Sequence, residues 1–281
     1  MSAIYLDNRF VHYEVYGRGQ PIIFLHSWVG SWRYWVPMMD LVTERYRAYA
    51  LDFWGFGDSD RSNGTNAYTI GAYAEMLVQF TNQMGVSRAN LVGHGLGGMV
   101  AVHAARTHPD RFPRLMLVST PLRGQIIGET IRPNALSRLM GRSNPTDIWT
   151  KLIRQMPIDN PTIKQEVLDD TEGLSENVVK AVQQSVTQTD LLPMMNSLTN
   201  TPLLAVYGEK DTIVPPEHAH VLNNESDRPH QLLVLPRVSH FPFLEDTATF
   251  GRLIMDFIVS KGSPVEIKEQ WRRRVSQREY I

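Results

Sequence analysis

The chain has 281 residues, 42% of them hydrophobic, and a formal net charge of −1 at pH 7. This length and composition allow one large α/β domain with an insertion, and the near-zero charge gives no electrostatic reason to expect nucleic acid or an anionic membrane as a partner. The chain has no cysteine, which excludes disulfides, a cysteine nucleophile and thiolate metal sites and suits a reducing cytoplasm. The first ten residues lack the apolar centre of a signal peptide, and no apolar stretch is long enough to span a bilayer. We therefore expect a cytoplasmic protein that does not enter membranes.

Short apolar segments alternate with helical patterns through the first part of the chain. The expected strands lie at residues 4–6, 11–15, 21–25, 46–51, 89–92 and 115–118, and the expected helices at 31–44, 69–84 and 99–107. The first two strands flank Asp7-Asn8, which predicts a β-hairpin at a sheet edge. Strands that alternate with helices are typical of a parallel sheet with right-handed crossovers.

The strand pattern then stops and resumes later. Residues 120–198 contain several short helical patterns separated by prolines, and structureless connections of this length are unusual in a compact domain. Two more strands are expected at 202–207 and 231–235, followed by a closing helix at 247–259. The predicted organisation is a core of residues 1–119 and 199–262, a helical insertion at 120–198, and a terminal extension at 263–281.

A strand, a glycine-rich turn and a helix meet at Asn90–Gly98. This is the context of the nucleophile elbow, whose pattern is G-x-S-x-G. The outer glycines of the pattern are present as Gly93 and Gly97, but Gly95 stands where the serine belongs. The spacing does not match the dinucleotide-binding pattern, so a Rossmann domain is not indicated.

Four other segments agree with the elbow and follow one another in a fixed order. They are Phe24–Trp28, Asp52–Ser59, Tyr207–Asp211 and Val238–Pro242. Together with the elbow they resemble the α/β-hydrolase superfamily of esterases, lipases and C–C hydrolases, over roughly residues 3–260. The resemblance implies an α/β-hydrolase fold, with a mostly parallel sheet, helices on both faces and a helical lid over the active site at 120–198. A longer crossover connection is the alternative for that segment.

The resemblance also implies roles for particular residues. His240 stands in the position of the general base and Asp211 in that of the acid that holds its tautomer, whereas Gly95 occupies the nucleophile position. The backbone N–H groups of Trp28 and Leu96 are the expected oxyanion-hole donors. Because these donors belong to the backbone, they survive any change of side chain.

Five further residues are candidates for contact with a substrate: His26, Ser27, His94, Trp149 and Phe241. In the family the positions of His26 and His94 usually shape the oxyanion loop and the sheet side of the elbow. Ser27 replaces a glycine that is usual after His26. Its hydroxyl could donate to a ligand oxygen or substitute as the nucleophile, although a tolerated small residue is the favoured interpretation.

Three hypotheses follow from Gly95. The chain is a serine hydrolase whose nucleophile was removed by drift or by an experimenter, an enzyme in which Asp211 and His240 act as a general base without a serine, or a non-catalytic receptor or carrier of a small ligand. Retention of both acid and base favours an enzyme acting on a small apolar or aromatic carbonyl or ester compound, inactive as an ordinary serine esterase. No organic cofactor and no metal are indicated, because no zinc-ligand spacing is present.

The terminal extension contains Ile267, Trp271 and Val275 on one face of a helical pattern. We expect this helix to pack on its own domain. A surface for self-association, and so a homo-oligomer, is the alternative.

Overall fold

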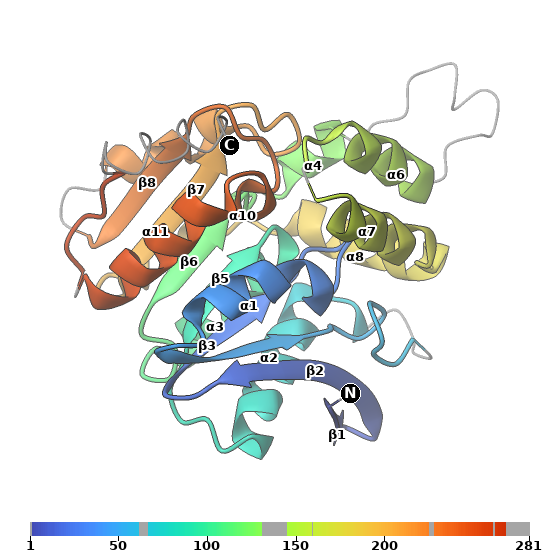
Figure 1. Ribbon diagram of the computed structural model, residues 1–281, viewed down its shortest axis with the longest axis horizontal. Coiled ribbons are helices and arrows are strands. Elements are labelled where there is room, and N and C mark those ends of the chain that lie inside the picture. Colours follow the sequence, from blue (N-terminus) through green and yellow to red (C-terminus); the bar gives the residue numbers. More distant parts are fainter. Residues whose placement is uncertain are drawn as a thin grey trace, which may run out of the picture.

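An eight-stranded sheet organises the computed structural model, which describes residues 2–61, 67–130, 145–158, 160–224, 228–260 and 262–267 (Figure 1). The strand order is β1-β2-β4-β3-β5-β6-β7-β8. The strands are β1 (Ser2–Leu6), β2 (Arg9–Gly17), β3 (Gln20–Leu25), β4 (Tyr46–Leu51), β5 (Asn90–His94), β6 (Leu115–Val118), β7 (Leu203–Gly208) and β8 (His230–Leu235). β1 and β2 pair antiparallel with each other, and β2 pairs antiparallel with β4, whereas all the remaining pairs are parallel.

Helices cover both faces of this sheet, and further helices form the segment between β6 and β7. They are η1 (Trp32–Trp35), α1 (Val36–Val42), α2 (Ile70–Gln83), α3 (Leu96–Thr107), α4 (Gln125–Thr130), α6 (Pro145–Gln155), α7 (Pro161–Glu172), α8 (Glu176–Gln188), α9 (Leu192–Met195), η3 (Pro216–Asn224), α10 (Pro242–Glu245) and α11 (Thr247–Val259). α1 packs with α11 on one face, and α2 packs with α3 on the other. The predicted fold, a mostly parallel sheet between two helical layers, is confirmed.

Local sequence explains these elements. All residues of β6 and of β7 are buried, as expected for apolar strands covered on both faces. Asp7 and Asn8 have φ angles of 49° and 60°, and two central residues with positive φ suit the tight turn of the β1–β2 hairpin. Thr69 begins α2, since its side-chain oxygen accepts a hydrogen bond from the N–H of Ala72 at 3.2 Å.

The segment between β6 and β7 is helical in its described parts, apart from a single bridge between Arg123 and Asp190. α4, α6, α7 and α8 gather on one side of the molecule (Figure 1). α7 is tied to the core because the carboxylate of Asp170 accepts a hydrogen bond from Ser31 Oγ at 2.5 Å and lies 3.6 Å from the guanidinium of Arg33. Whether this segment opens and closes as a lid, and where its boundaries fall, stay predictions.

The end of the described chain lies along the edge strand β8. The N–H of Val265 donates to Gln231 Oε1 at 2.8 Å, and Gln231 Nε2 donates to the carbonyl of Val265 at 2.6 Å. The predicted face of Trp271 and Val275 lies outside the described residues.

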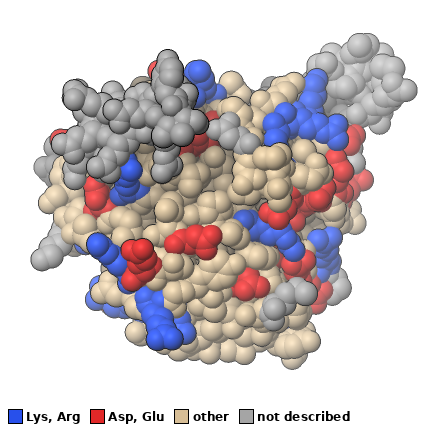
Figure 2. Space-filling model, in the orientation of Figure 1, with Lys and Arg blue, Asp and Glu red and all other residues tan. Residues whose placement is uncertain are grey.

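Charge is mixed on the face of the molecule shown in Figure 2. Acidic and basic side chains alternate there and do not form a large patch of one sign. This distribution agrees with the formal net charge of −1. None of the helices in the described ranges has the length and apolar character needed to cross a membrane.

Candidate active site

The turn between β5 and α3 has the geometry of a nucleophile elbow without the nucleophile. Gly95 has φ 51° and ψ −113°, and α3 begins at the next residue. Residues with a side chain rarely adopt this conformation, and they do so at a cost of about 1–3 kcal/mol, which glycine avoids. A Cβ atom at Gly97 would lie 2.2 Å from the carbonyl oxygen of Leu25. The tight approach of α3 to β3 therefore requires glycine at 97.

Ser27 fills the space beside Gly95. A Cβ atom built on Gly95 would lie 2.3 Å from Ser27 Oγ and 3.1 Å from Ser27 Cβ. The Ser27 side chain therefore stands against the place from which a nucleophile at 95 would extend. Ser27 is 5% exposed, and within the described residues its hydroxyl has no hydrogen-bond partner, whereas its backbone has two.

His240 and Asp211 form a buried acid–base pair. His240 Nδ1 lies 2.9 Å from Asp211 Oδ2, and Asp211 Oδ1 accepts hydrogen bonds from the N–H groups of Ile213 and Val214, both at 2.9 Å. Burial by itself would raise the pKa of Asp211, but attraction to His240 and the hydrogen bonds from His240 and Val214 outweigh it and lower that pKa. An ionised Asp211 holds the proton of His240 on Nδ1, which leaves Nε2 free to accept a proton.

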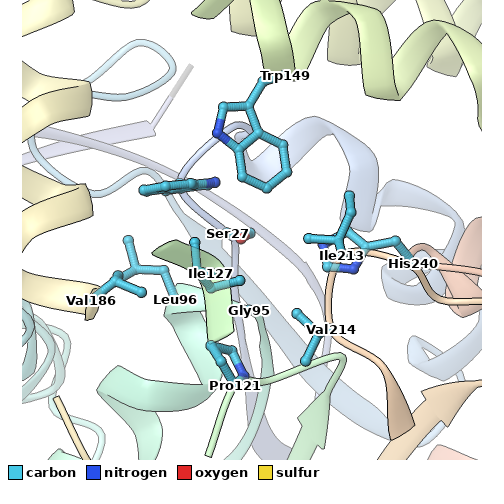
Figure 3. A pocket seen from close by; sticks show the side chains of 11 residues that line it. Ser27, Gly95, Leu96, Pro121, Ile127, Trp149, Val186, Ile213, Val214 and His240 are labelled. Carbon is cyan, nitrogen blue, oxygen red and sulfur yellow. The ribbon is translucent and has the colours of Figure 1, made fainter. Parts of the chain in front are cut away.

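A narrow cavity brings these residues together (Figure 3). Its volume is about 20 Å³, which is enough for one water molecule. The lining residues are Ser27, Trp28, Gly95, Leu96, Pro121, Ile127, Trp149, Val186, Ile213, Val214 and His240. Ser27 lies near the centre of this group and Trp149 lies over it. Apart from Ser27 and His240, the side chains of the lining are apolar.

Two backbone amides border the cavity. The N–H groups of Trp28, in the loop after β3, and Leu96, the first residue of α3, have no backbone acceptor in the part of the chain that the structure describes. Unpaired amides at a helix N-terminus and a neighbouring loop suit a developing negative charge on a carbonyl oxygen.

Two histidines near the cavity are structural in their contacts. His94 is fully buried, its Nε2 lies 3.1 Å from the carbonyl of His240, and its Nδ1 lies 3.2 Å from the hydroxyl of Tyr34. Burial, together with the nearby His240, lowers the pKa of His94 well below its ordinary value, so this ring is neutral. His26 is also fully buried, and its ring nitrogens bond the carbonyl of Ser27 at 2.6 Å and the N–H of Phe53 at 2.9 Å.

A family model described as the alpha/beta hydrolase fold matches residues 20–149, a range that includes Ser27 and the elbow. This match, together with the relatives, supports the α/β-hydrolase superfamily for this chain. It is 26% identical to the uncharacterized hydrolase YugF of Bacillus subtilis, with 89% of this chain and 93% of that protein covered. It is 25% identical to the pimeloyl-[acyl-carrier protein] methyl ester esterase of Vibrio vulnificus, with 88% of this chain and 97% of that protein covered.

Solved structures of the α/β-hydrolase fold superpose on most of the chain. The enol-lactonase of Burkholderia xenovorans matches with a TM-score of 0.77 at 19% identity and covers 92% of this chain and 99% of its own. A thermophilic esterase of Thermogutta terrifontis matches with a TM-score of 0.76 at 22% identity and covers 91% of this chain and 95% of its own. At this level of identity the superpositions establish the fold.

Within this α/β-hydrolase fold, the predicted site residues fall into two groups. Those that line the cavity are Ser27, Trp28, Gly95, Leu96, Trp149 and His240, and those outside its lining are His26, His94, Asp211 and Phe241. Asp211 bonds the ring of His240, and the Phe241 ring packs 5.0 Å from that of His94. The structure adds Tyr34, which the sequence did not single out because it lies in a helical stretch that carries no motif.

One group of side chains has spacing that suits a metal ion, when the described residues are searched: His12, Asp52 and Asp58. The Asp52 carboxylate already accepts hydrogen bonds from the N–H of Trp32 at 2.8 Å and of Asp58 at 2.9 Å, and it lies 3.1 Å from His12 Nδ1. These contacts hold the loop after β4 in place. The Asp52 oxygens that a metal would need already accept these hydrogen bonds, so the cluster does not fit an open metal site.

Proposed function

We propose that the chain hydrolyses esters of small carboxylic acids with His240 as the general base. The observation that carries this function is the 2.9 Å contact between His240 Nδ1 and Asp211 Oδ2 at a cavity bordered by Trp28 and Leu96, whose amides have no acceptor among the described residues. A receptor or carrier has no need for a base, an acid that holds its tautomer and two unpaired donors around one cavity.

The chemistry follows from these positions. His240 Nε2 accepts the proton of an attacking O–H group, and Asp211 stabilises the imidazolium that forms. The ester carbonyl oxygen gains negative charge as the carbon is attacked, and the amides of Trp28 and Leu96 stabilise that charge. The apolar walls, including the rings of Trp28 and Trp149 at 5.0 Å, exclude water and strengthen these interactions.

The size of the cavity limits the substrate. Its volume of about 20 Å³ is far below the roughly 300–1,000 Å³ of ordinary ligand sites. Because this space holds about one water molecule, an ester enters only when α6 or α8, which carry Trp149 and Val186, move, and a short apolar acyl group requires the smallest movement. The relative that is named a methyl ester esterase supports ester hydrolysis as the reaction class.

The test compares p-nitrophenyl acetate, butyrate and octanoate as substrates. We expect acetate to be hydrolysed fastest and His240→Ala to remove the activity, whereas His220→Ala, which changes an exposed histidine on η3, leaves it unchanged. Hydrolysis at the same rate in the His240→Ala variant, or undetectable hydrolysis in the unmodified chain, overturns the function. The receptor or carrier and the disabled hydrolase then remain, and the paired substitution below separates them.

The nucleophile-disabled hypothesis needs a paired substitution. Gly95→Ser alone would place its Cβ against Ser27, so the serine must be restored in the Ser27→Gly background. Activity that appears only in the Ser27→Gly/Gly95→Ser variant identifies a disabled serine hydrolase.

A further inference from the structure

We propose that Ser27 supplies the nucleophile, so that the reactive hydroxyl has moved from the elbow after β5 to the loop after β3. This assignment rests on the proposed ester hydrolysis and selects the group from which His240 takes a proton. In the alternative, His240 activates a water molecule and the reaction has no covalent intermediate.

Position is the first reason. Ser27 Oγ lies 2.3 Å from the point where a Cβ atom of residue 95 would stand, so it stands directly beside the start of any side chain at the elbow. A serine at both positions would overlap. Glycine at 95 together with serine at 27 leaves one hydroxyl at this point of the cavity, and His240 lines the same cavity.

The oxyanion donors are the second reason. In this fold one donor is the amide of the residue after the nucleophile, and the other comes from the loop after β3. With Ser27 as the nucleophile, Trp28 becomes the residue that follows it, and Leu96 becomes the donor from the facing loop. The same two unpaired amides therefore serve both arrangements, and only their roles are exchanged.

The contacts of Ser27 are the third reason. Its N–H donates to the hydroxyl of Tyr34 at 2.5 Å, and its carbonyl accepts from His26 Nδ1 at 2.6 Å. The backbone is thus held on both sides. Ser27 is 5% exposed, and its Oγ has no partner among the described residues, which leaves this hydroxyl available to pass its proton to a base.

The reaction balances with these groups. Ser27 Oγ forms a bond to the ester carbonyl carbon while its proton passes to His240 Nε2, and the carbonyl electron pair moves to the oxygen. The tetrahedral intermediate collapses, the C–O bond to the alcohol breaks, and the leaving alkoxide takes the proton from His240. Water then attacks the acyl-serine with His240 as the base, which releases the carboxylic acid and restores the Ser27 hydroxyl.

Because the chain has no cysteine, Ser27→Cys creates a protein with a single thiol. We expect this thiol to react with iodoacetamide as a thiolate at a pH at least one unit below that of an ordinary cysteine, which titrates near 8.5, because His240 stabilises the thiolate. Ser87→Cys, at an exposed position, is the matched control with ordinary titration. Adding His240→Ala should return the Ser27→Cys profile to that of the control. Identical profiles for both thiols overturn the assignment.

Covalent labelling with a fluorophosphonate provides a second readout that does not depend on Ser27→Cys folding. We expect one adduct per chain, located on Ser27 by peptide mass analysis and lost in Ser27→Ala and His240→Ala. We also expect Ser27→Ala to lower kcat for p-nitrophenyl acetate by at least about 10³-fold. Absence of an adduct on Ser27 overturns the assignment.

The two proposals fail in different ways. Hydrolysis that depends on His240 but survives in Ser27→Ala keeps the esterase function, removes Ser27 as nucleophile and favours activated water. Labelling of Ser27 without hydrolysis of any ester keeps Ser27 as nucleophile and removes the proposed substrate class.

Discussion

The amide of Ser27 donates to the hydroxyl of Tyr34 at 2.5 Å, and that hydroxyl lies 3.2 Å from His94 Nδ1. On the other side of the ring, His94 Nε2 lies 3.1 Å from the carbonyl of His240. A carbonyl can only accept, so His94 carries its proton on Nε2, and the Tyr34 hydroxyl donates to Nδ1. One buried network of hydrogen bonds thus joins the loop of Ser27 to the loop of His240.

Tyr34→Phe should weaken both ends of this network. Phenylalanine cannot accept from the Ser27 amide, so we expect a loss of about 1–3 kcal/mol in the free energy of unfolding and a fall of about tenfold in kcat with little change in KM. Tyr73→Phe is the matched control, since the buried Tyr73 hydroxyl donates to the Trp54 carbonyl at 2.9 Å, away from the cavity lining. It should lower stability and leave kcat unchanged. Equal kcat values for the two variants contradict a positioning role for Tyr34.

Gly95→Ala should destabilise the protein. The φ angle of 51° is unfavourable for alanine, and its Cβ would approach Ser27 Oγ to 2.3 Å. We expect a loss of about 3 kcal/mol in the free energy of unfolding, measured with denaturant. In the Ser27→Gly background the clash with Ser27 Oγ is absent, so Gly95→Ala should lower the free energy of unfolding by only about 1–2 kcal/mol. Additive effects of the two substitutions contradict the contact between these side chains.

Asp211→Asn should impair catalysis more than stability. The amide no longer provides the negative charge that stabilises imidazolium and can hold the wrong tautomer of His240, so kcat should fall by about 10³–10⁴-fold. Asp169→Asn, which changes an exposed aspartate on α7, should have no effect on kcat. Kinetics with p-nitrophenyl acetate would measure both. A fall of less than tenfold would show that Asp211 is dispensable to the base.

Stability should depend on pH through Asp170. Burial raises the pKa of Asp170 to about 6, although Ser31 and Arg33 favour its ionised form. Because the folded state holds this proton more tightly than the unfolded state, Asp170 favours folding below the unfolded pKa near 4, and this contribution falls as the pH rises from 4 to 6. We therefore expect the stability difference between the unmodified chain and Asp170→Asn to decrease by roughly 2 kcal/mol over this range. A difference that does not change with pH contradicts the raised pKa.

The sequence alone determined the fold and the order of its functional segments. Continuous apolar runs identified the buried strands, and the glycines at 93 and 97 identified the turn, because both signals depend on residues that are neighbours in the chain. Asp211 and His240 were singled out for the same reason, since each follows a strand that the pattern reveals. That glycine stands at position 95, where the G-x-S-x-G pattern has serine, is likewise visible in the sequence itself.

Only the tertiary structure shows that Ser27 stands against Gly95. Ser27 and Gly95 lie far apart in the chain, and the sequence favoured Ser27 as a tolerated small residue. Their contact arises because β3 and β5 are adjacent and parallel, so the loops that follow these strands meet at the same edge of the sheet. The hydrogen-bond network through Tyr34 and the cavity walls from α4, α6 and α8 depend in the same way on packing between distant segments. No local pattern records such packing, because each side chain is placed by neighbours that come from other parts of the sequence.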